Sequence, residues 1–188
     1  MDVARLLRDP LSRRRFVGVS MASAACLTGC SDDTKSADAG PDESDEADVE
    51  ILNSALDLEL MAIAAYKAGA ALLGGERLQM VQGFLEQEQQ HADELGSAID
   101  DAGGTPNEAK ASYDFPTWRS GDDVLRYAVD LENTAIAAYV DALPKLGQGD
   151  LRATAAAIVT TEAEHIAVLL GALGMEQVPA AFVVGKAS

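Results

Sequence analysis

The sequence predicts an all-α protein: a four-helix bundle made of two helical hairpins that a long crossover joins. Apolar residues recur at helical spacing over most of residues 48–174, and no convincing strand alternation is present. Glycine pairs interrupt this pattern where a hairpin turn and a helix end would fall. In addition, residues 59–66 return as residues 132–139 with six of eight positions identical. The length of about 130 residues suits one domain with a single core.

The first 29 residues have the features of an export signal. Ser12-Arg-Arg-Arg-Phe16 is followed by an apolar run that is shorter than the roughly 20 residues a membrane span needs. This pattern resembles a twin-arginine export signal. Its end, Leu27-Thr-Gly-Cys30, resembles a lipoprotein cleavage box, and an ordinary signal cut elsewhere is the alternative. We expect an exported protein on the periplasmic or cell-surface side, with a lipid anchor at Cys30.

An acidic segment, residues 30–47, follows the signal. It contains one lysine and no aromatic residue, so it is predicted to be a disordered tether. Removal of residues 1–29 would take away five Arg and two Asp, which changes the net charge from −17 to −20. Such a charge disfavours nucleic acids and anionic surfaces. The only membrane contact that we expect is therefore the lipid anchor. Cys30 would be the single cysteine left, which excludes a disulfide within the mature chain.

The first hairpin is predicted from its helix boundaries. Its first helix begins near Asp48, a suitable N-cap, and ends at the glycine pair 74–75. The second helix covers residues 76–101 and ends before the glycine pair 103–104. Because only a two-residue turn joins these helices, they are expected to be antiparallel neighbours.

Residues 105–120 are predicted to form the crossover. They include Pro106 and Pro116 and show no helical period. The segment also contains a small aromatic group, formed by Tyr113, Phe115 and Trp118. We expect these aromatic side chains to hold the crossover against the bundle, and ligand binding is the alternative.

The second hairpin begins with a helix from about Asp122 that ends before Pro144, because proline disfavours a helical residue before it. The last helix covers residues 150–173 and is followed by Gly174. The remaining tail, residues 175–188, is apolar enough to pack on the bundle or on a neighbouring subunit. A homodimer is one assembly that such a tail would allow.

The candidate metal ligands are repeated in the two hairpins. Glu88 and His91 form one Glu-x-x-His motif, Glu162 and His165 form the other, and these are the only two histidines of the chain. Residues three apart on a helix share a face, so a carboxylate and an imidazole can bind the same ion.

A lone glutamate precedes each motif. Glu59 lies 29 residues before Glu88, and Glu132 lies 30 residues before Glu162. Each lone glutamate falls on an otherwise apolar helical face. One glutamate from each of two helices and Glu-x-x-His from each of the others are the ligands of a carboxylate-bridged two-metal site.

Metal also offers an electrostatic explanation for this arrangement. Four carboxylates that face one core would repel each other strongly, and two divalent cations would neutralise them. A metal-free network of buried glutamates and histidines is the alternative. Three other acidic residues near the motifs fit the ligand faces less well and are predicted to be solvated: Glu86, Glu94 and Glu164.

These motifs resemble those of the ferritin-like proteins, which include bacterioferritin and rubrerythrin, over residues 48–174. The resemblance implies a ferritin-like four-helix bundle with two metal ions. It also implies that Glu88 and Glu162 bridge the ions. Two further pairs would complete the two positions: Glu59 with His91, and Glu132 with His165. Mixed carboxylate and imidazole ligands suit two iron ions, with two manganese ions as the alternative.

Two tyrosines are candidate catalytic residues. Tyr66 and Tyr139 lie seven residues after the lone glutamates, on the same helical face. They would donate hydrogen bonds to ligands or pass an electron, and the alternative is an aromatic residue that only packs.

The chain also departs at three positions from the pattern of the family that it resembles. Ala135 stands where rubrerythrin would have a further glutamate. Gln87 and Thr161 stand where many relatives have an aspartate that orients a histidine, so the contacts around the ligands are expected to differ.

The resemblance implies redox chemistry on O2 or H2O2 with Fe(II) oxidation, that is, a ferroxidase or peroxidase type of oxidoreductase. The chain lacks the cysteines of a rubredoxin-type iron centre, so an external electron donor is expected. One alternative is disproportionation of peroxide by manganese, as in manganese catalases. Another is a metal-binding or storage protein that catalyses nothing.

Overall fold

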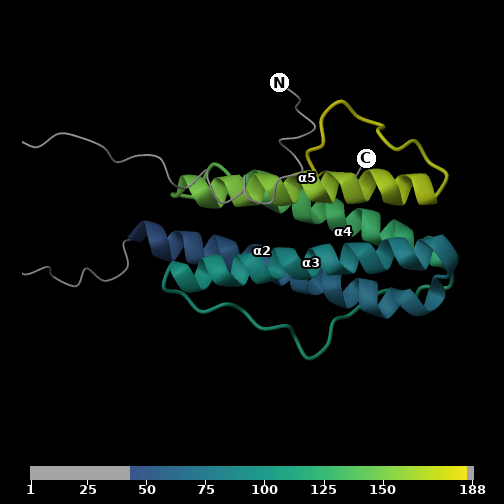
Figure 1. Ribbon diagram of the computed structural model, residues 1–188, viewed down its shortest axis with the longest axis horizontal. Helices are drawn as coiled ribbons and strands as arrows, with labels where there is room; N and C mark the ends of the chain where they lie inside the picture. Colours follow the sequence, from purple (N-terminus) through teal and green to yellow (C-terminus); the bar gives the residue numbers. More distant parts are fainter. Residues whose placement is uncertain (1–42, 186–188) are drawn as a thin grey trace, which may run out of the picture. The chain divides into compact units, whose positions relative to one another are not determined.

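The computed structural model describes residues 43–185, and these residues form a bundle of α-helices without a β-strand. Figure 1 shows the two hairpins. The elements are the α-helices α2 (Glu43–Gly69), α3 (Gly75–Asp101), α4 (Gly121–Ala142) and α5 (Gly149–Ala172), and the short 3₁₀-helix η1 (Ala70–Leu72). The prediction of an all-α four-helix bundle is confirmed. The predicted signal, the anchor at Cys30 and most of the tether lie outside the described residues.

Helices α2 and α3 run antiparallel, as do α4 and α5, and the segment between α3 and α4 crosses from one end of the bundle to the other (Figure 1). Between the hairpins, α2 contacts α4 and α3 contacts α5. Each hairpin therefore presents both of its helices to the other hairpin, and side chains from all four helices reach the central core.

The start of α2 differs from the prediction. The helix begins at Glu43, not near Asp48, so residues 43–47 of the predicted tether are helical. Asp48 does not cap the helix, because its carboxylate is buried and accepts a hydrogen bond from the N–H of Gly147 at 2.8 Å. Asp45 accepts a second bond from the side chain of Gln148. These long-range contacts give the acidic residues partners on the α4–α5 loop, which composition alone does not reveal.

Helix α2 also ends earlier than predicted, at Gly69, and the chain continues as η1 before the turn. The N–H of Leu73 bonds to the carbonyl of Ala70 at 3.1 Å, as in the tightened last turn of many helices. Gly75 has a φ of 58°, a left-handed conformation that favours glycine. The other three helices begin and end within one or two residues of the predicted positions.

The crossover is held at both of its ends. Asn53 of α2 donates to the carbonyl of Thr105 and accepts from the N–H of Asn107. Near α4, the rings of Phe115 and Trp118 stack on each other and contact Tyr127 of that helix, with ring centroids 5.3–5.9 Å apart. The prediction that aromatic residues hold the crossover against the bundle is thus correct.

Helix α4 begins with a capping box. The Ser120 hydroxyl accepts from the N–H of Asp123, and the Asp123 carboxylate accepts from the N–H of Ser120. Helix α5 is long and apolar enough to cross a membrane by length and composition. However, it carries Glu162 and His165, both buried inside the bundle, so we interpret it as a core helix.

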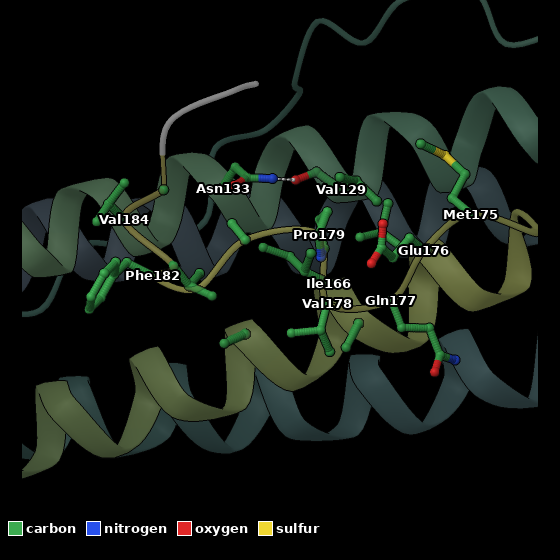
Figure 2. Close-up of a pocket in the computed structure, with 16 residues that line it drawn as sticks. Val129, Asn133, Ile166, Met175, Glu176, Gln177, Val178, Pro179, Phe182 and Val184 are labelled. Atoms are coloured by element: carbon green, nitrogen blue, oxygen red, sulfur yellow. Dashed lines mark hydrogen bonds between the residues drawn. The ribbon is translucent and has the colours of Figure 1, made fainter.

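The tail packs on its own bundle (Figure 2). It leaves α5 through Gly174, at a φ of 71°, and passes over α4 and α5. A Cβ at Gly185 would clash with the carbonyl oxygen of Asn133, so the backbones of the tail and α4 are in direct contact there. Between these points the tail encloses an apolar cavity of about 310 Å³. Val178 and Phe182 remain exposed.

Candidate metal centre

The six side chains that the sequence nominated as ligands lie together in the core. Each hairpin contributes one lone glutamate from its first helix and one Glu-x-x-His motif from its second helix. All four glutamates and His165 are fully buried, with side-chain exposures of 2% or less, whereas 13% of the His91 side chain is exposed. The apolar residues that share the stripes of Glu59 and Glu132 are buried as well: Leu52, Ala55, Ala62, Ile63, Leu125, Ala128, Ala135 and Ile136.

The ligand atoms form two overlapping groups. Within each group, one ligand atom per residue lies within 4.8 Å of all the others. The first group is Glu59, Glu88, His91 and Glu162, and the second is Glu88, Glu132, Glu162 and His165. Glu88 and Glu162 belong to both groups. This division is the one that the family resemblance implied, with two shared carboxylates between two ion positions.

The ligand atoms are close together without being aligned for hydrogen bonds. His91 Nδ1 lies 3.0 Å from Glu162 Oε1, and His165 Nδ1 lies 3.1 Å from Glu88 Oε1. Yet both Nδ1 atoms and all four carboxylate oxygens of Glu88 and Glu162 are buried without a hydrogen-bond partner. Buried polar atoms without partners are costly. A cation placed among the ligand atoms of each group would give these unpartnered atoms a partner, so the residues fit a pair of metal ions.

The lone glutamates resist ionisation when no cation is present. The pKa of Glu59 is raised to about 8, chiefly by burial and also by the nearby Glu162 and Glu88 carboxylates, against the opposing effect of His91. Burial also raises the pKa of Glu132 well above its usual range, with contributions from the Glu162 and Glu88 charges. Both residues therefore hold a proton easily in the metal-free site.

The shared glutamates and the histidines are charged in the metal-free site. Burial opposes ionisation of Glu162, but contacts with His165 and His91 outweigh it and lower its pKa to about 2. The pKa of Glu88 is also lowered, because the same two histidines outweigh burial.

Burial lowers the pKa of each histidine, but the surrounding carboxylates outweigh it. The pKa of His91 is raised to about 12, chiefly by Glu162, and that of His165 to about 11, chiefly by Glu132. Two imidazolium ions thus balance the charges of the two shared carboxylates, Glu88 and Glu162.

The two candidate catalytic tyrosines bind ligands of the opposite hairpin. The Tyr66 hydroxyl on α2 donates to Glu132 on α4, and the Tyr139 hydroxyl on α4 donates to Glu59 on α2 at 2.5 Å. The repeat predicted that the tyrosines share a face with the lone glutamates, and the pairing is reciprocal across the bundle. Each hydroxyl thus holds one carboxylate oxygen of the lone glutamate on the opposite hairpin.

Sequence reasoning named Gln87 only as a departure and did not nominate Phe84. The Gln87 Oε1 atom lies 2.7 Å from His165 Nε2, on the opposite hairpin. The Phe84 ring lies against the His165 ring, with centroids 4.0 Å apart and planes at 31°. The position of Gln87, directly before Glu88, was the available signal. The three acidic residues predicted to be solvated, Glu86, Glu94 and Glu164, are all exposed.

Comparison with known families agrees with this geometry. The ferritin-like domain matches residues 47–175, which is more than half of the chain. The chain belongs to the ferritin-like domain family. No curated protein matches it at a significant level.

Solved structures show the same ferritin-like fold. A conserved hypothetical protein of Mycobacterium tuberculosis is 27% identical, with a TM-score of 0.66 over 74% of this chain and 99% of its own. A protein of Bacillus anthracis described as a ferritin-like diiron-carboxylate protein is 24% identical, with a TM-score of 0.62 over 70% and 99%. The bacterioferritin of Desulfovibrio desulfuricans, described with a diiron site, is 20% identical, with a TM-score of 0.63 over 80% and 97%. The ferritin-like fold and the cluster of glutamates and histidines together support a di-metal site in this chain.

Proposed function

We propose that this protein binds two iron ions in the ferritin-like site and carries out redox chemistry on O2 or H2O2 while oxidising Fe(II). The observation that supports it most strongly is the pair of overlapping ligand groups that share Glu88 and Glu162. Relatives described as diiron proteins with the same fold favour iron over manganese.

Two iron ions bound side by side would supply two electrons at once, so that peroxide is reduced without release of a one-electron radical. The overall reaction is balanced when two Fe(II) are oxidised to Fe(III) and one H2O2 takes up two electrons and two protons to give two waters. Fe(II) is the electron source in this reaction, and sustained turnover on a fixed iron pair would require an external electron donor.

The residues of the chain prepare the site for this chemistry. Four carboxylates balance the charge of two divalent ions, and the surrounding apolar core excludes water, which strengthens the electrostatic interactions inside. Tyr66 and Tyr139 hold the lone glutamates through their hydroxyl groups. Their position next to ligand carboxylates also suits proton or electron transfer.

Metal content and peroxide consumption test this proposal. Protein expressed with its export signal would be purified from its natural compartment, and its iron and manganese would be measured. We expect about two iron ions per chain and loss of H2O2 that depends on added Fe(II). A variant in which Glu162 is replaced by alanine serves as the control, because it removes a residue that both ligand groups share.

Other outcomes would favour the alternatives. Loss of peroxide with bound manganese and no donor would indicate a manganese catalase activity. Uptake of metal without consumption of O2 or peroxide would indicate a storage or binding role. A folded protein that takes up neither metal would contradict the di-metal function altogether.

We also propose that the protein is exported and anchored to a membrane by a lipid. The arginine-rich start and the Leu27-Thr-Gly-Cys30 segment support export and a lipid anchor at Cys30. Replacement of Arg13 and Arg14 by lysine is expected to stop export. Metabolic labelling with a fatty acid is expected to mark the normal chain and to fail in a Cys30→Ala variant.

A further inference from the structure

We propose that the two metal positions are unequal, because Gln87 positions His165 for tight binding whereas His91 leaves its position open to exchange with solvent. This inference rests on the proposed di-metal function. It concerns which ion is retained and which residue decides it, and it arises from contacts that differ between the two hairpins.

His165 is fixed from two sides. Gln87 Oε1 lies 2.7 Å from Nε2, and because a carbonyl oxygen only accepts, Nε2 must carry a proton in this contact. In the neutral ring the lone pair is then on Nδ1, which faces the carboxylates of Glu88, Glu132 and Glu162 at 3.1–3.4 Å. The Phe84 ring packs on the imidazole. A ligand held in its binding orientation loses little freedom when an ion binds.

His91 lacks both of these supports. Thr161 occupies the position equivalent to Gln87, but its hydroxyl bonds to the carbonyl of Ala157 on its own helix at 3.4 Å. Ile158 occupies the position equivalent to Phe84. Among residues 43–185, no hydrogen bond to His91 Nε2 is found, and 13% of its side chain is exposed against 2% for His165. An ion at His91 is therefore bound by a less restrained ligand that solvent can reach.

The length of the side chain at this position accounts for the difference. The Gln87 amide reaches from α3 to the imidazole on α5, while a threonine hydroxyl is too short for the equivalent reach and bonds locally. Gln87 is itself exposed, so its replacement disturbs no core packing. This makes Gln87 a positioning residue that can be tested without damage to the fold.

The test is a titration of the full chain with Co(II), monitored by calorimetry and by the visible absorption of the bound ion. We expect two binding steps, the first at least about tenfold tighter than the second. Gln87→Leu removes the acceptor and is expected to weaken the first step about 10- to 100-fold while the second stays unchanged. Gln87→Glu keeps an acceptor at the same reach and should preserve the tight step. Thr161→Val, the matched control, should alter neither step.

Location of the first ion gives a second measurement. A crystal loaded with one equivalent of Co(II) should show anomalous scattering beside His165 and none beside His91. Preferred occupation of the His91 position, two equal steps in the unchanged chain, or an unaltered first step in Gln87→Leu would each overturn the inference. A folded chain that binds no Co(II) would instead contradict the proposed function, and circular dichroism establishes that each variant is folded.

Discussion

His165 and His91 occupy equivalent positions in the two hairpins, yet their surroundings differ. His165 is enclosed by Gln87 and Phe84, whereas His91 is partly open to solvent. The ligand motifs are repeated, but the residues beside them are not. The comparison shows that an internal repeat can preserve the chemistry of a site while its supporting contacts diverge. The predictions below test whether the two metal positions differ. They use variants of the shared glutamates, the lone glutamates and the residues that hold the ligands.

The largest effect is expected at the residues that the two halves share. Glu162→Ala removes a carboxylate from both ligand groups, so the variant should lose uptake of both ions. We expect the apparent affinity to fall by more than the roughly 100-fold that loss of a supporting contact can cause. Metal analysis after dialysis against Co(II) measures this. Retention of one ion would mean that the two groups are independent.

Next in size is the dependence of metal uptake on pH. Because their pKa values are raised to about 12 and 11, His91 and His165 are both imidazolium ions at neutral pH when no metal is bound. Each must lose one of its two ring protons before the nitrogen can bind an ion. Uptake is therefore favoured as pH rises and opposed as pH falls. Each ion should bind at least about tenfold more weakly per unit decrease in pH.

Calorimetry in buffers of different ionisation enthalpy counts the protons released. At least one proton per ion is expected near pH 7, and more where Glu59, with its pKa raised to about 8, also loses a proton. Uptake that does not vary with pH would show that the imidazoles are neutral before metal binds.

Variants of the lone glutamates distinguish the two metal positions. Glu59→Gln changes only the His91 group and should leave one ion bound near His165, whereas Glu132→Gln should leave one ion bound near His91. If the halves are unequal, the ion left by Glu59→Gln should resist removal by a chelator for longer. The time course of Co(II) removal measures this, and equal rates in the two variants would contradict the comparison.

The smallest effect is expected at the tyrosines. Tyr66→Phe and Tyr139→Phe each leave a buried carboxyl oxygen without its donor, which costs about 1–3 kcal/mol of stability in the metal-free protein. Thermal or denaturant unfolding of both variants measures this cost. Because the two hydrogen bonds are reciprocal, the costs should be similar. A loss confined to one variant would reveal asymmetry at the lone glutamates as well.

The helices and the ligands followed from local patterns in the chain. Apolar spacing predicted α3, α4 and α5 closely, because their ends coincide with glycine, proline or a capping serine. The start of α2 was predicted wrongly, because Asp48 finds its partner on Gly147, 99 residues away. The composition of the acidic segment does not reveal whether its carboxylates have hydrogen-bond partners elsewhere in the chain, so the sequence could not predict that residues 43–47 are helical.

By itself, the sequence determined which residues face the core and which can bind metal. These properties depend on spacings of three to seven residues. Because an α-helix has about 3.6 residues per turn, residues three, four or seven apart lie on the same face. Only the tertiary structure decided which side chains meet across the two hairpins. Tyr66 with Glu132 and Gln87 with His165 are 66 and 78 residues apart in the chain, and their contact depends on the register in which the hairpins pack. That register is set by the packing of all four helices together, so no short stretch of sequence encodes it.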